Sequence, residues 1–171
     1  MSAPALTVPY LAAVALLAGA GVAKAAHPSD TTRALRDAGF PVDRRMVRAG
    51  AAGEVAVAVV AVAWSGRLGP SLVAAAYAAF AAFVVAALRR GWSLSSCGCF
   101  GKPDARPSYL HAVLDAGAAL CALVWAVTAP GSLGQVISSD SGNALWLLVS
   151  GGVVAGLAYA VWTRPLETGV T

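Results

Sequence analysis

The sequence predicts an all-α bundle of helices that span a membrane, and three observations support this fold class. First, 58% of the 171 residues are hydrophobic and only 12% are charged, which is about half the charged share of a soluble domain. Second, the chain contains several charge-poor apolar runs of about 20 residues, the length that crosses a bilayer. Third, nearly all basic residues lie between these runs. A soluble core could not bury so much apolar surface, so we expect a single integral membrane domain over residues 1–171.

Five apolar runs define the predicted transmembrane helices. They cover residues 7–23, 49–65, 69–88, 108–128 and 143–163. Four spans would remain if the second run, which contains Glu54, were not a span, or if the first run were a cleaved signal peptide. The absence of Lys or Arg ahead of the first run argues against a signal peptide. Between the first two runs, we expect Asp30 to cap a short interfacial helix over residues 31–39.

The basic residues predict the orientation. Eleven of the twelve fall on one side of the predicted spans, and only Arg67 falls on the other. The positive-inside rule then places the N-terminus outside and the C-terminus in the cytosol of a multi-pass cell-membrane protein. The basic residues form no stripe with interleaved aromatic residues, which argues against nucleic-acid binding. Tryptophans lie at both predicted interfaces, as membrane anchors do: Trp64, Trp125 and Trp146 outside, Trp92 and Trp162 inside. The alternative is that some of them pack between helices.

Ionisable side chains inside the predicted spans gather near the cytosolic ends. Glu54 lies about one turn into the second span, while His111 and Asp115 share one face of the fourth span at i and i+4. Such groups are costly in a membrane and are functional candidates by default. The alternatives are structural: Glu54 could pair with Lys24 or Arg48, His111 could be a satisfied interfacial side chain, and Asp115 could serve the N-terminus of its helix.

Two cysteines one residue apart are the most distinctive motif. Cys97 and Cys99 lie in a polar segment, residues 89–107, that is predicted to be cytosolic. A turn at Gly98 would bring the thiols into disulfide range, and the small ring would be strained and therefore labile. Nearby basic residues favour the reactive thiolate. Cys121, deep in the fourth span, is expected to pack and not to join this pair.

Three interpretations of the cysteine pair stay open at this point. The favoured one is redox exchange, with a thiolate of Cys97 or Cys99 attacking a partner disulfide and with His111 or Asp115 managing the proton. The second is a site for a soft metal ion that also uses His111. The third is a purely structural loop. We expect no cofactor and no resident metal.

The arrangement resembles a known family. Gly21-x-x-Lys24 ends the first run, Glu54 lies in the second, and Cys97-Gly98-Cys99-Phe100-Gly101 lies between the third and fourth. In these features the chain is similar to the methylamine utilisation protein MauE family, a distant relative of the DoxX-type membrane bundles. The resemblance implies an accessory role in the maturation of methylamine dehydrogenase, hence in methylamine metabolism, together with a thioredoxin-like partner.

The resemblance also implies roles for individual residues. Cys97 and Cys99 would be the redox pair of a membrane thiol-disulfide oxidoreductase, and Glu54 and Lys24 would shape the site or pack helices. The rival functions are a non-catalytic membrane assembly or scaffold protein with structural cysteines and, less favoured, a transporter of a small solute or metal. Besides the lipid bilayer and a thioredoxin-like protein, a second copy of the chain is a candidate partner.

Overall fold

The structure, a computed structural model, describes residues 3–92, 108–128, 132–139 and 144–163. Within these ranges the chain forms seven α-helices and no β-strand. Their bounds are α1 Ala3–Ala26, α2 Pro28–Asp37, α3 Arg44–Ala63, α4 Leu68–Arg90, α5 Tyr109–Thr128, α6 Leu133–Ser139 and α7 Ala144–Thr163. The predicted all-α class is therefore confirmed.

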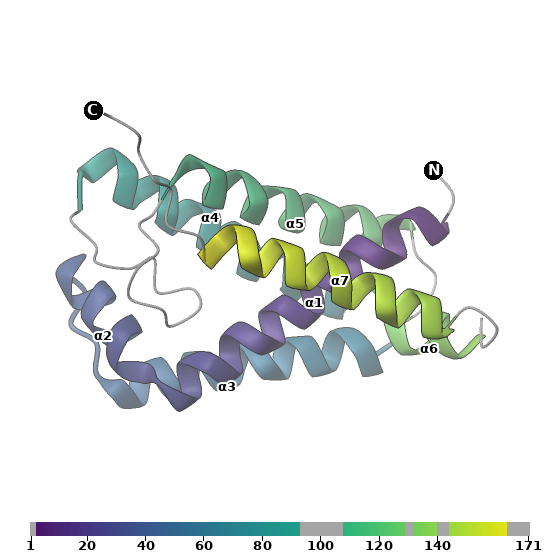
Figure 1. Ribbon diagram of the computed structural model, residues 1–171. Helices are drawn as coiled ribbons and strands as arrows, with labels where there is room; N and C mark the ends of the chain where they lie inside the picture. The colour runs from purple at the N-terminus through teal and green to yellow at the C-terminus, as the bar shows by residue number, and fades with distance from the viewer. Residues whose placement is uncertain (1–2, 93–107, 129–131, 140–143, 164–171) are drawn as a thin grey trace.

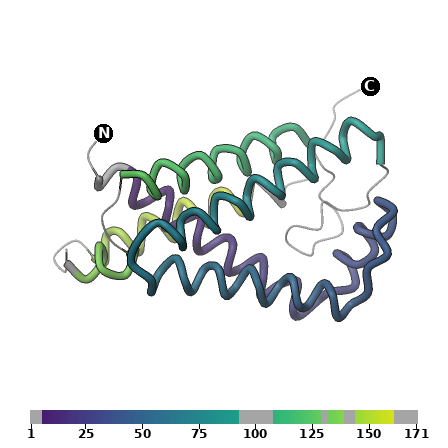
Figure 2. The backbone as a smooth tube through the Cα atoms, turned by 180° about the vertical axis from the view of Figure 1, so that it is seen from behind, coloured from purple at the N-terminus to yellow at the C-terminus, as the bar shows by residue number. Residues whose placement is uncertain are grey.

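Five long helices run lengthwise through the molecule, and two short ones lie at its ends (Figures 1 and 2). α1 packs against α3, α4, α5 and α7, and α4 packs along α5. α1 and α4 finish, and α3 and α5 begin, at the end where α2 lies. We call this end the α2 end. Because α1 contacts all four other long helices, it forms the centre of the bundle.

A core of large side chains holds the long helices together. Tyr10 of α1 stacks on Trp125 of α5 with ring centroids 4.8 Å apart, and Tyr77 of α4 donates a hydrogen bond of 2.7 Å to the carbonyl oxygen of Ala13. Trp125 is only 2% exposed, so its predicted role as an interfacial anchor is wrong and the alternative holds, because its ring packs between α1 and α5. Trp64 and Trp146 are exposed, as that role requires.

The outer faces of the bundle are apolar. Large side chains such as Val59, Leu120 and Leu157 are more than half exposed. In water this surface would be unfavourable, whereas lipid tails cover it at no cost. The helices α3, α4 and α5 and the Leu6–Ala26 part of α1 are long and apolar enough to cross a membrane. The molecule is therefore a helical membrane bundle.

The predicted spans agree with the helices except in two places. The helix of the second predicted span, α3, starts at Arg44, five residues before the predicted start of the span. The side chain of Asp43 caps this helix, because it accepts a hydrogen bond of 2.8 Å from the backbone N–H of Met46. The fifth run forms α7, but its apolar stretch with described side chains, Ala144–Ala160, is shorter than the four long spans. A fifth crossing therefore stays a prediction.

The two short helices also refine the expectations. α2 occupies the predicted interfacial helix, but it starts at Pro28, so Asp30 lies inside the first turn and His27 takes the N-cap position. The predicted capping role of Asp30 is therefore wrong, because proline is well suited to begin a helix. α6 was not expected. Ser132 and Gln135 exchange two hydrogen bonds of 3.1 Å between side chain and backbone at its start, which is the geometry of a capping box.

Candidate functional site

A buried ion pair joins α1 to α3 near the α2 end. The Nζ atom of Lys24 lies 2.6 Å from Oε1 of Glu54, and the two side chains are 7% and 15% exposed. Of the two partners considered for Glu54, the structure selects Lys24. Glu54 is the eleventh residue of α3, about 15 Å along the helix from its start.

A glycine on α1 allows the two helices to lie close enough for this ion pair. Gly21 precedes Lys24 by three residues, and a Cβ atom at Gly21 would come within 2.8 Å of the carbonyl oxygen of Ala51 and 3.2 Å of the Cβ of Glu54. Real Cβ atoms do not approach backbone so closely, so only glycine allows α1 to lie against α3 here. The Gly21-x-x-Lys24 motif therefore has a direct structural use.

The environment of the pair compensates the Lys24 charge more fully than the Glu54 charge. The Lys24 ammonium lies 4.6 Å from the centroid of the Phe80 ring, within the range of a cation–π contact. Lys24 also lies in the last turn of α1, where the helix dipole favours a positive charge. In contrast, Oε2 of Glu54 is buried and accepts no hydrogen bond from any residue in the described ranges. One acceptor of the pair therefore stays available.

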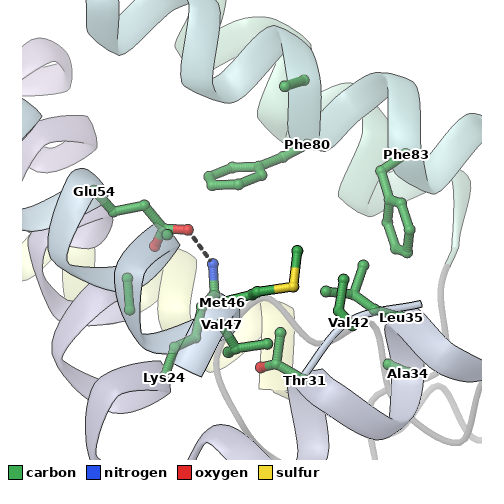
Figure 3. A pocket seen from close by; sticks show the side chains of 13 residues that line it. Lys24, Thr31, Ala34, Leu35, Val42, Met46, Val47, Glu54, Phe80 and Phe83 are labelled. Atoms are coloured by element: carbon green, nitrogen blue, oxygen red, sulfur yellow. Dashed lines mark hydrogen bonds and ion pairs between the residues drawn. The ribbon is translucent and has the colours of Figure 1, made fainter. Parts of the chain in front are cut away.

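The ion pair forms part of the wall of a cavity of about 370 Å³ between four helices. Figure 3 shows the cavity with the Lys24–Glu54 pair on one side, Phe80 and Phe83 of α4 above it, and Met46 and Leu35 facing them. Apart from Lys24, Glu54 and Thr31, the lining residues are apolar: Ala34, Leu35, Val42, Met46, Val47, Gly50, Ala51, Ala79, Phe80 and Phe83. A mostly apolar pocket with a few polar groups is typical of small-molecule sites.

His111 and Asp115 form a second polar group. Both lie on the inner face of α5 and are 4% exposed, and Nδ1 of His111 is 2.6 Å from Oγ of Ser108. They share the α2 end with Lys24, but α5 contributes no residue to the cavity lining. The structure therefore brings Glu54 together with Lys24, and His111 together with Ser108 and, one turn along α5, Asp115.

Cys97 and Cys99 lie outside the described residues. Their segment follows Trp92, which comes directly after α4 and its αL glycine Gly91, and precedes Ser108 at the start of α5. Both flanking positions belong to the α2 end of the bundle. Cys121 is half-buried on α5 and packs against the core, as expected.

The described residues offer no metal centre of three or more His, Cys, Asp or Glu side chains. The groups that could hold a ligand are instead the Lys24 ammonium, the free Glu54 oxygen and the two phenylalanine rings. The sequence did not single out Phe80 and Phe83. Their i, i+3 spacing in an otherwise alanine-rich helix is the signal that could have indicated them.

Comparison with known proteins identifies the family. The family model described as methylamine utilisation protein MauE matches residues 1–129, a range that contains the ion pair, the cavity, both cysteines, His111 and Asp115. No curated protein matches the chain, and no solved structure matches it. Because the match covers about three quarters of the 171 residues, the chain belongs to the MauE family of membrane proteins.

Proposed function

We propose that the protein is a membrane thiol-disulfide accessory factor whose Cys97–Cys99 pair acts on a partner protein, with methylamine metabolism as its setting. The observation that carries the proposal is the Cys97-Gly98-Cys99-Phe100-Gly101 motif inside the region that matches the MauE family. A pair of thiols in a chain that provides few other reactive groups is suited to disulfide exchange.

The proposed step is a two-electron exchange. A thiolate of Cys97 or Cys99 attacks a disulfide of the partner, forming a mixed disulfide and releasing one partner thiolate, which takes up a proton. The second cysteine then attacks the mixed disulfide, so that a Cys97–Cys99 disulfide forms and the partner leaves as a dithiol. The partner gains two electrons and two protons. A thioredoxin-like dithiol protein would restore the reduced pair by the reverse exchange.

The fold supports this proposal through its second polar group. His111 and Asp115 lie on the inner face of α5, within its first two turns after the segment that contains the cysteines. An imidazole close in sequence to the thiols is a suitable group to take the proton when a thiolate forms. We assign His111 and Asp115 this supporting role, with Ser108 orienting the His111 ring.

Trapping of the mixed disulfide tests the proposal. In cells that express Cys97→Ser or Cys99→Ser, one of the two variants should accumulate a covalent adduct that reductant dissolves. The double variant should form none, because it lacks both thiols. Cys121→Ser is the matched control, since Cys121 is half-buried against the core on α5, and this variant should behave as the wild type.

The rival function, an assembly protein with structural cysteines, predicts a different pattern. It gives no adduct in either single variant, and the thiols of the wild type would react with an alkylating reagent to the same extent with and without prior reduction. That combined result would overturn the redox proposal. The metabolic setting is tested separately: loss of the gene should prevent growth on methylamine, and the wild type, but not the double variant, should restore it.

A further inference from the structure

The cavity next to the Lys24–Glu54 pair has the chemistry of a binding site for an uncharged molecule. The two charges at its wall cancel, so an ion entering the cavity would meet no net opposite charge and would lose its hydration. The remaining lining is almost entirely apolar. The volume of about 370 Å³ falls within the range of about 300–1,000 Å³ found for small-molecule sites.

The polar wall of the cavity favours a ligand whose head group forms hydrogen bonds. Lys24 has three N–H donors, and Glu54 accounts for one of them. Oε2 of Glu54 is buried and accepts no hydrogen bond from the described residues. A buried ion pair is stable only when its remaining donors and acceptors are satisfied. A ligand hydroxyl group that accepts a hydrogen bond from Lys24 and donates one to Oε2 of Glu54 would satisfy both side chains.

The opposite walls favour an aromatic ring. Phe80 and Phe83 lie on one side of the cavity, and the side chains of Met46 and Leu35 lie across from them (Figure 3). Aromatic rings pack favourably against other rings and against thioether sulfur. A flat ring between these walls would contact both surfaces.

The opening of the cavity indicates how the molecule arrives. Met46 is 57% exposed, and Gly50 and Ala79 are also exposed, although all three line the cavity. They belong to α3 and α4, two helices that are long and apolar enough to cross a membrane. The cavity is therefore reached along α3 and α4, which suits a ligand that is dissolved in the bilayer.

We propose that this cavity binds a lipid-soluble molecule with a hydroxylated aromatic head, the chemistry that a phenol and a quinol share. The hydroxyl group accepts a hydrogen bond from Lys24 and donates one to Glu54, the ring lies between Phe80 and Met46, and the apolar tail leaves between α3 and α4. This site is distinct from the cysteine pair, and the proposal does not depend on thiol exchange.

Binding to the purified protein in detergent micelles tests the proposal, with titration calorimetry as the measurement. The probes are an alkylphenol, an alkylquinol kept under argon, and an alkylbenzene with the same tail but no oxygen. The wild type should bind the phenol, the quinol or both about tenfold to a hundredfold more tightly than the alkylbenzene, as expected for hydrogen bonds to charged groups. The stronger of the two oxygenated probes then identifies the source of the ligand.

Two variants locate the site. Lys24→Met combined with Glu54→Leu should bind the oxygenated probes no more tightly than the alkylbenzene. Gly50→Leu fills the cavity and keeps the ion pair, because a Cβ atom at Gly50 meets nothing within 4 Å. It should weaken the binding of all probes. Gly53→Leu is its matched control, since Gly53 on the same helix has equal space and does not line the cavity.

The outcomes separate this proposal from the redox function. A wild type that binds the phenol and the quinol no better than the alkylbenzene would overturn the proposal, and so would Gly50→Leu binding like Gly53→Leu. The Cys97→Ser/Cys99→Ser double variant should bind the probes as the wild type does. Normal binding by a variant that has lost disulfide exchange would support the ligand site independently of the thiols.

Discussion

At the scale of single residues, the sequence limited the ion-pair partner of Glu54 to two candidates, but it could not decide between them. Arg48 was the alternative partner of Glu54. Because α3 begins at Arg44, Arg48 and Glu54 lie on one helix at i and i+6, a spacing that places them on different faces. The Asp43 cap was the signal in the sequence that could have revealed this. Lys24, in contrast, reaches Glu54 from α1 across the contact at Gly21.

Removal of one partner of this pair should destabilise the protein strongly. Glu54→Leu leaves the Lys24 ammonium buried without its counter-ion, and we expect a loss of about 3–5 kcal/mol in the free energy of unfolding. Lys24→Met together with Glu54→Leu removes both charges and should stay within about 1 kcal/mol of the wild type, or exceed it. Unfolding in mixed micelles with increasing SDS measures these differences.

The control for this prediction is Arg48→Met. Arg48 is exposed on α3, so its loss should leave the free energy of unfolding nearly unchanged. A stable single Glu54→Leu variant, or a double variant as unstable as the single one, would contradict the structural role of the pair.

At the scale of helices, individual glycines set how closely the helices pack. A Cβ atom at Gly21 would clash with α3, and one at Gly151 of α7 would come within 2.6 Å of Cδ2 of Leu11 on α1. The GxxxG step of Gly152 and Gly156 is different, because a Cβ atom at either position meets nothing within 4 Å. The motif alone therefore does not identify the contact, since which face of a helix meets a neighbour depends on the fold.

Two glycines on α1 provide a matched test of this packing. Gly21→Ala forces the added methyl group against the carbonyl oxygen of Ala51 and should cost about 1–3 kcal/mol of stability. Gly19→Ala adds the same group where nothing lies within 4 Å and should stabilise the helix by up to about 1 kcal/mol. SDS-induced unfolding, followed by circular dichroism, distinguishes the two. Equal effects at both positions would show that α1 and α3 are not in close contact at Gly21.

At the scale of the whole molecule, the apolar runs determine most of the fold. Runs of about 20 apolar residues predicted the four candidate spans in α1, α3, α4 and α5, because backbone hydrogen bonds in lipid must be satisfied within a helix. The fold also places the start of α5, which contains His111 and Asp115, at the end where α1 finishes with Lys24. Glu54 differs, because it is the eleventh of the 20 residues of α3. The cavity could not be predicted. It arises where α2 packs against α1 and α3 and faces α4, and no local pattern encodes that tertiary arrangement.

The short elements mark the limit of the sequence-based prediction. α6 has only seven residues, too few to show a clear period, although Ser132 and Gln135 form the capping box that could have indicated it. Trp125 shows the same limit for a single side chain. Its position near a span end favoured a membrane anchor, but the Tyr10 ring beside it draws it into the core.

The orientation of the whole bundle is open to direct measurement. Eleven of the twelve basic residues lie on one side of the predicted spans, so we expect the N-terminus outside and the C-terminus in the cytosol. Fusion of green fluorescent protein, which folds in the cytosol, after Thr171 should therefore give fluorescent cells. Truncation after Thr128, the last residue of α5, should place the same reporter outside and give cells without fluorescence, while alkaline phosphatase fused there should be active.

The pair of fusions also tests α7, since both reporters would lie on one side of the membrane if α7 did not cross it. Fluorescence from the Thr128 fusion together with active phosphatase after Thr171 would reverse the proposed orientation and place the Cys97–Cys99 segment outside.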